Sequence, residues 1–141
     1  MAVNRLLLAL PLIALGVSLS LADEDAAPSL EEMAAMVTGD SDAGAAVFGQ
    51  CRACHVADAP TNRVGPHLVG LFGRTAGGVD GFNYSDAMRE SGIVWTPETL
   101  SAYLATPREA IPGNRMAFAG VRDEARRADL IAYLFAVTSP E

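Results

Sequence analysis

The sequence predicts an all-α domain of about four to five short helices joined by long loops. Apolar residues recur at helical spacing in several short segments, as at Leu100, Tyr103 and Leu104 and again at Leu130, Ile131, Leu134 and Phe135. No alternation of apolar and polar residues is long enough for a sheet. Glycine and proline are frequent in residues 56–84, which is typical of turns and loops. The 141 residues fit one domain.

The N-terminal 22 residues have the pattern of a secretory signal peptide. Arg5 precedes an uncharged apolar run at residues 6–22, which ends in Ser20-Leu21-Ala22, with small residues at the two positions that a signal peptidase reads. We expect cleavage after Ala22 and an exported mature chain. An uncleaved membrane anchor is the alternative, because the run has about 17 residues and lies at the short limit for spanning a bilayer.

Residues 23–41 form an acidic extension with six carboxylates and no basic residue. Ser29 and Glu32 have the spacing of a capping box, and Met33 and Val37 then fall on one helical face. We therefore expect a short helix in this extension. A disordered acidic spacer is the alternative.

Residues 42–141 form the predicted domain, and four helices are expected within it. The first covers about residues 43–53, with Asp42 as its cap, and the second begins at Ser85 and is ended by Gly92. The third begins at Thr96 and stops at Thr106-Pro107, and the last runs from about Asp123 to Val137. Residues 56–84 and 107–121 are expected to be loops. The first of these loops is too long for a compact domain unless it packs against something other than protein. A large apolar cofactor would provide that contact.

The charge pattern argues against one class of function. All ten basic residues are arginine, and seventeen acidic residues give a formal net charge of −7. The chain has no basic patch with interleaved aromatic residues, so nucleic-acid binding is not expected.

The motif CRACH at residues 51–55 holds both cysteines of the chain, and four interpretations of it compete. A disulfide with this spacing needs a strand–helix setting, and no strand is predicted before Cys51. Zinc would need the cysteines with His55 and His67, but the adjacency of Cys54 and His55 hinders both from reaching one ion. Two inert thiols would leave His55 without a role. Covalent haem uses all three residues, because two thiols add to the haem vinyl groups and the next imidazole reaches the iron.

A haem iron needs a sixth ligand or an open site, and Met116 is the candidate ligand. It lies in the segment IPGNRMAF at 111–118, where proline and glycine favour an extended, turned loop. A thioether opposite histidine favours ferrous iron and raises the reduction potential. His67 is the other possible ligand, but it lies twelve residues from His55 and is expected at the surface.

With these residues placed, the chain resembles the class I c-type cytochromes, specifically the bacterial relatives of mitochondrial cytochrome c, over about residues 42–138. The motifs that carry the resemblance occur in the family's order. They are Gly44 and Phe48 before CRACH, GPHL at 65–68, GLFGR at 70–74, GFNYSDA at 81–87, Trp95, Thr99-Leu100 with Tyr103-Leu104, PGNRMAFAG at 112–120, and DLIAYL at 129–134.

The resemblance implies a single haem-packed domain with crossing first and last helices, one haem c, and a role for each of ten residues. The thioether anchors would be Cys51 and Cys54, and the axial ligands would be His55 and Met116. Pro66 would accept the His55 ring N–H, and Tyr103 would lie beside the Met116 sulfur. The buried propionate would bind Arg74, Tyr84 and Trp95, and Phe118 would cover the haem edge.

Two departures from the family's pattern stand out. Relatives that dock on acidic partners carry lysines around the haem edge, whereas this chain has no lysine, and Arg52, Arg108 and Arg115 are the residues that could supply positive charge there. Met88 occupies a place where relatives often have a polar residue.

The resemblance also implies a periplasmic one-electron carrier and not an enzyme. The expected donor is a membrane cytochrome bc complex or a periplasmic dehydrogenase, and the expected acceptor is a terminal oxidase or a photosynthetic reaction centre. We expect a monomer. A membrane-anchored electron-transfer cytochrome is the alternative if residues 6–22 are retained, and a haem peroxidase or ligand sensor would need Met116 to be absent from the iron.

Overall fold

The protein is all-α, as predicted. The computed structural model describes residues 27–139, so the expected signal segment at 1–22 lies outside the described residues. The helices of the described range are α1 (Leu30–Met36), α2 (Ser41–Phe48), α3 (Asp86–Glu90), α4 (Pro97–Ala105), α5 (Pro107–Ala110) and α6 (Glu124–Thr138). No helix in this part of the chain is long and apolar enough to cross a membrane.

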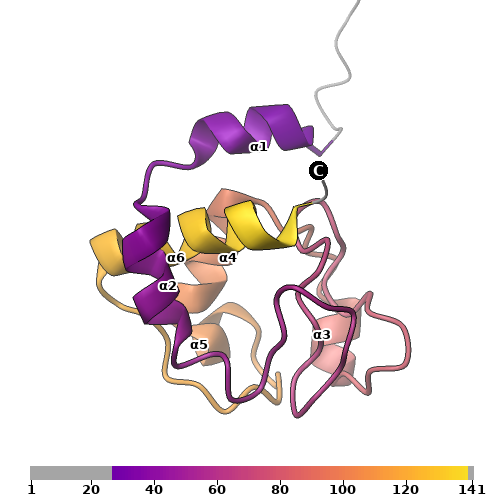
Figure 1. Ribbon diagram of the computed structural model, residues 1–141. Coiled ribbons are helices and arrows are strands. Elements are labelled where there is room, and N and C mark those ends of the chain that lie inside the picture. The colour runs from indigo at the N-terminus through magenta and orange to yellow at the C-terminus, as the bar shows by residue number, and fades with distance from the viewer. Residues whose placement is uncertain (1–26, 140–141) are drawn as a thin grey trace, which may run out of the picture.

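Helix α2 crosses α6, and Gly44 makes the crossing close (Figure 1). A methyl group on Gly44 would collide with the backbone carbonyl of Asp129 and would lie 2.8 Å from Cβ of Tyr133. The ring of Phe48 at the end of α2 packs on Tyr133 with ring centroids 5.1 Å apart. The first and last helices of the predicted domain therefore cross as expected.

The predicted start of α2 is wrong by two residues. Asp40, and not Asp42, is the N-cap, because its Oδ1 accepts hydrogen bonds from the backbone N–H groups of Asp42 and Ala43. Regular helix also ends earlier than predicted, at Phe48, and the residues that follow form tighter turns.

The caps of the three other predicted domain helices lie at the expected residues. Ser85 caps α3, Asp123 caps α6, and Thr96 caps α4 with Pro97 in its first turn. The loop predicted at 107–121 needs a correction, because Pro107 begins one further turn of helix, α5. Proline ends α4 since it has no N–H to donate, but its fixed φ suits the first position of a new helix.

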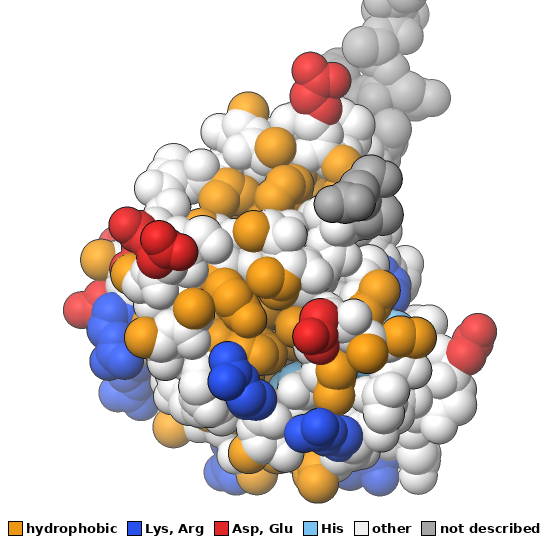
Figure 2. All heavy atoms as spheres, in the orientation of Figure 1, with side chains coloured by type: hydrophobic (Ala, Val, Ile, Leu, Met, Phe, Trp, Pro, Cys, Tyr) orange, Lys and Arg blue, Asp and Glu red, His pale blue; other side chains and the backbone are white. Residues whose placement is uncertain are grey.

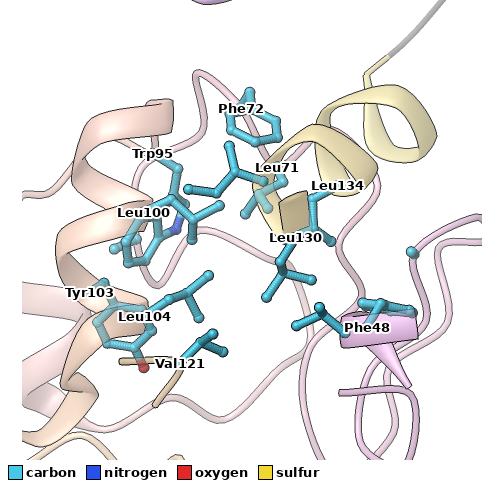
Figure 3. Packing of buried hydrophobic residues seen from close by; sticks show 14 of the residues in the cluster. Phe48, Leu71, Phe72, Trp95, Leu100, Tyr103, Leu104, Val121, Leu130 and Leu134 are labelled. Carbon is cyan, nitrogen blue, oxygen red and sulfur yellow. The ribbon is translucent and has the colours of Figure 1, made fainter. Parts of the chain in front are cut away.

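Buried side chains of α4 face those of α6 across the core (Figure 3). Leu100 and Leu104 approach from α4, and Leu130 and Leu134 from α6. The four repeat at the helical spacing that the sequence analysis used to predict these faces. Trp95, just before α4, packs on Tyr103 with ring centroids 5.1 Å apart.

The acidic extension contains the expected helix, and this helix packs on the domain. Ser29 and Glu32 form the predicted capping box at the start of α1. Met33 is 1% exposed and belongs to the same core cluster as the side chains of α4 and α6. At the end of the extension, the Asp40 N–H donates to Oδ1 of Asp129 at 2.8 Å. Helix α1 therefore packs against the domain, and a disordered spacer does not describe residues 30–36 (Figure 1).

Substitution of Gly44 by alanine tests the helix crossing. The added methyl group has backbone in its way, so Gly44→Ala should lower the free energy of unfolding by roughly 1–3 kcal/mol. Gly49→Ala is the matched control, because Gly49 has a right-handed helical φ of −47° and its methyl would meet only the Ala46 carbonyl, at 3.1 Å. Denaturant unfolding of the two variants should differ clearly, and equal midpoints would contradict the close crossing.

The two methionines of α1 test whether this helix contributes to stability. Met33→Ala should lower the free energy of unfolding by about 2–5 kcal/mol, since it leaves a cavity in the core. Met36→Ala is the matched control, because Met36 is on the same helix but is 39% exposed, so its truncation leaves no cavity. This variant should lower the free energy of unfolding by less than about 1 kcal/mol. If both variants unfolded like the wild type, α1 would not be packed in solution.

Candidate haem site

One cavity of about 450 Å³ lies at the centre of the predicted domain, between α4, α6 and the loops. All ten side chains assigned to haem binding by the sequence analysis line it. They are Cys51, Cys54, His55, Pro66, Arg74, Tyr84, Trp95, Tyr103, Met116 and Phe118. The volume falls within the range of about 300–1,000 Å³ that is usual for cofactor sites.

Apolar side chains gather in the middle of one face of the molecule, with arginines along its lower edge (Figure 2).

The two cysteines occupy one turn that continues α2. The backbone N–H groups of Cys54 and His55 both donate to the Cys51 carbonyl at 3.0 Å, and the Cys51 N–H donates to the Phe48 carbonyl at 2.8 Å. This winding lets both sulfurs line the cavity together with the His55 ring. Both thiols are free and half-buried, so the disulfide interpretation finds no support.

The His55 ring is held in one orientation by its neighbours. Its Nδ1–H donates to the Pro66 carbonyl at 2.7 Å. A methyl group on Gly65 would lie 2.7 Å from that nitrogen, so only glycine lets the backbone pass so close to the ring. Burial lowers the pKa of His55, and the bond to Pro66 opposes that shift in part. The ring therefore favours its neutral form, with Nε2 as the nitrogen left to bind a metal.

Met116 lies in a loop that is folded around Asn114. The side-chain amide of Asn114 donates to the carbonyls of Pro107 and Ile111 at 2.7 and 2.8 Å, and its oxygen accepts from the Met116 N–H at 3.0 Å. The Tyr103 hydroxyl lies 3.8 Å from the Met116 sulfur and donates to it. Burial raises the pKa of Tyr103 to about 12, so this hydroxyl keeps its proton at neutral pH.

Arg74 provides the cationic end of the cavity. Its guanidinium donates to the carbonyls of Val69 and His67 at 2.9 and 3.3 Å, while its Nε is buried without a partner among the described residues. Burial raises the pKa of Tyr84, and the neighbouring Arg74 charge opposes this shift. A buried N–H of a cation needs an acceptor, and a carboxylate such as a haem propionate would be one.

His67 reaches the surface only in part. The residue is half-buried, and its Nδ1 is buried without a partner in the described structure. It is absent from the cavity lining, so it is not a second candidate for the iron. The described residues also contain no group of three His, Cys, Asp or Glu side chains suited to one metal ion, which leaves the zinc interpretation without ligands.

Several apolar lining residues were not predicted as part of the site. They are Leu68, Leu71, Phe82, Leu100, Leu104, Leu130 and Leu134. The leucines of α4 and α6 were recognised only as inward-facing stripes, because helical spacing shows which face is buried and does not show what it is buried against. The apolar walls, the neutral imidazole, the thioether and the unpaired N–H of Arg74 together fit a haem.

Comparison with known proteins supports this fit. No family model matches the chain. Cytochrome c2 of Blastochloris viridis is 50% identical over 96 residues, which cover 67% of this chain and 76% of the relative. Cytochrome c 2.1 of Caenorhabditis briggsae is 48% identical over 103 residues, covering 72% of this chain and 92% of the relative.

A solved structure is similar to this chain in both sequence and fold. Cytochrome cH from Methylobacterium extorquens is 42% identical and superposes with a TM-score of 0.66 over 70% of this chain and 99% of its own. The chain therefore belongs to the class I c-type cytochromes, electron carriers with one haem c, which is held here through Cys51 and Cys54.

Proposed function

We propose that this cytochrome is a periplasmic one-electron shuttle in which His55 and Met116 are the axial ligands. The observation that carries the proposal is that the His55 ring and the Met116 thioether line the same cavity, each already fixed by hydrogen bonds to the surrounding chain. The bound haem supplies reversible one-electron chemistry at its iron. With both axial positions taken by side chains, no position is left for a substrate or for oxygen.

The surrounding residues then set the potential and keep water out. Pro66 fixes the tautomer of His55 and increases its basicity as a ligand. Tyr103 donates to the Met116 sulfur and so withdraws electron density from it. Arg74 offers an N–H to a buried carboxylate. Phe118 is half-buried in the cavity wall beside Met116 and shields the site from solvent.

Export of the chain and weak docking on redox partners complete the proposal. The segment 1–22 has the pattern of a signal peptide, so cleavage after Ala22 would release residues 23–141 into the periplasm. A cytochrome bc complex or a periplasmic dehydrogenase would supply the electron, and a terminal oxidase or a reaction centre would accept it. Such encounters bury little surface, so charges near the cavity act mainly on the rate of association.

Replacement of Met116 tests the axial assignment. The wild type should show the weak red absorption band that reports sulfur bound to ferric haem, and its reduced form should not bind carbon monoxide. Met116→Ala should lose the band, bind carbon monoxide and have a lower reduction potential. Met88→Ala is the control, because Met88 also presents a thioether to the cavity but is expected to keep the band. Carbon monoxide binding by the wild type would favour a peroxidase or sensor instead.

Charge reversal at Arg108 tests the docking surface. Arg108 is exposed and lines a groove together with Ala117 and Phe118, which also line the haem cavity. If the arginines attract an acidic partner, Arg108→Glu should slow electron transfer by roughly two- to tenfold at low salt, and added salt should slow the wild type. Arg126→Glu makes the same charge change on α6 at a residue that lines neither cavity nor groove, and should have less effect. Equal rates for both variants would rule out steering by Arg108.

A further inference from the structure

We propose that residues 30–40 of the acidic extension form a strap over the outer side of the loop that carries Arg74, and that Met33 is a positioning residue for Arg74. The terminal Cε of Met33 lies 3.9 Å from the point where a Cβ on Gly73 would stand. Apart from the chain neighbours of Gly73, no other atom of the described residues comes within 4 Å of that point. The inference rests on the role of Arg74 beside a haem carboxylate, which belongs to the proposed function.

The short segment that carries Arg74 is paired with the segment that carries Trp95. The Gly73 N–H donates to the Trp95 carbonyl at 2.8 Å, and the Trp95 N–H donates to the Arg74 carbonyl at 3.0 Å. The Ala76 N–H continues the pairing with a bond to the Ile93 carbonyl at 2.7 Å. Arg74 and Trp95 line the haem cavity, whereas Gly73 does not. The paired segments therefore form one unit with the cavity on one side and Met33 of the strap on the other.

The strap is fastened to α6 at a second point, where its backbone reaches this helix. A methyl group on Gly39 would collide with the backbone carbonyl of Ala128. The next residue, Asp40, donates its N–H to Oδ1 of Asp129 at 2.8 Å. Since the strap is held both here and at the buried Met33, it cannot slide along α6 without breaking one of the two contacts.

The side chain of Arg74 is held mainly by its own loop. Within the described structure its guanidinium donates only to the carbonyls of Val69 and His67. Both carbonyls belong to the same loop, so they move with Arg74 and do not fix it to the rest of the domain. At its start the loop is joined to α6 by a bond from the Gly70 N–H to the Thr138 carbonyl at 2.7 Å. Beyond that bond, the strap is the part of the chain that closes the outer side of the loop.

The position of Arg74 matters for the redox reaction because its charge acts on the iron. A nearby cation favours the reduced haem, which carries one positive charge less than the oxidised haem. In an apolar cavity this effect is larger than in water, and it falls when the guanidinium moves away or water enters. A strap that keeps Arg74 in place therefore keeps the reduction potential high.

The reduction potential of the holoprotein tests the action of Met33 on the haem. At a fixed ambient potential, Met33→Ala should lower the ratio of reduced to oxidised protein by roughly three- to tenfold, because the loop of Arg74 loses its support. Met33→Leu conserves the volume and should stay within about twofold of the wild type.

Two control variants separate this effect from a general loss of packing. Met36→Ala truncates an exposed methionine of the same helix, and Val121→Ala truncates a buried residue at the other end of the core (Figure 3). Both should keep the wild-type ratio. If Met33→Ala kept it too, Met33 would have no positioning role.

A double variant shows whether Met33 acts through Arg74. Arg74→Gln removes the cation and should itself lower the ratio of reduced to oxidised protein. Met33→Ala added to Arg74→Gln should lower the ratio no further, because the two changes then remove the same interaction. Fully additive effects would contradict the positioning role of Met33.

Amide hydrogen exchange in the reduced holoprotein reports on the strap without reference to the potential. Met33→Ala should speed exchange at the Gly73 amide by roughly tenfold more than at the Val121 amide, which donates to the Leu104 carbonyl. Gly39→Ala should have the same effect, since its methyl group would push the strap away from α6.

The exchange rates also separate failure of the strap from failure of the proposed function. Equal acceleration at the Gly73 and Val121 amides in both variants would mean a general loss of stability and would overturn the strap. If Arg74→Gln left the potential unchanged, the proposed role of Arg74 would be wrong, and the exchange rates alone would then uphold or overturn the strap.

Discussion

The close approach of α2 and α6 at Gly44 is the constraint on which the other features depend. Because backbone meets backbone there, the end of α2 has a fixed position over Tyr133 and the leucine stripe of α6. The cysteine turn follows directly from that end, so its sulfurs and the His55 ring are brought against side chains of α6 that also line the cavity. One glycine thus determines where the covalent attachment of the haem lies relative to the hydrophobic core.

The two axial candidates are held by different kinds of structure. His55 sits on a hydrogen-bonded turn and is oriented by a carbonyl and by a glycine that no larger residue could replace. Met116 sits on a loop whose shape comes from the hydrogen bonds of Asn114. The exposed Arg115 joins this loop to the opposite one through a hydrogen bond to the Asn83 carbonyl. Buried bonds are protected from water and exposed ones are not, so the methionine side is the one expected to open first.

The sequence was most informative where local chemistry decides the structure. Caps at Ser29, Ser85, Thr96 and Asp123 were found because a side chain bonds to the start of its own helix. Asp40 and Asp42 are the same type of residue and equally suited to cap a helix, so local chemistry does not distinguish them. Asp40 is the N-cap, and its N–H bonds to Asp129, 89 positions away in the sequence. The CRACH turn and Met116 could be recognised because few side-chain types perform their chemistry. The Arg115 bond could not, since it ends on a backbone carbonyl that leaves no mark in the sequence.

Helix α1 also decides where neighbouring chain is attached. Because Met33 fastens this helix to the domain, any residues before Ala27 join the folded body at α1, whereas α5 and its neighbouring loops lie at the opposite end of the molecule (Figure 1). A tether, an affinity tag or a second fused domain added at the N-terminus would therefore be attached on the side of the molecule that is remote from Arg108. Immobilisation through that end would leave Arg108 and the groove that it lines with Ala117 and Phe118 facing outward.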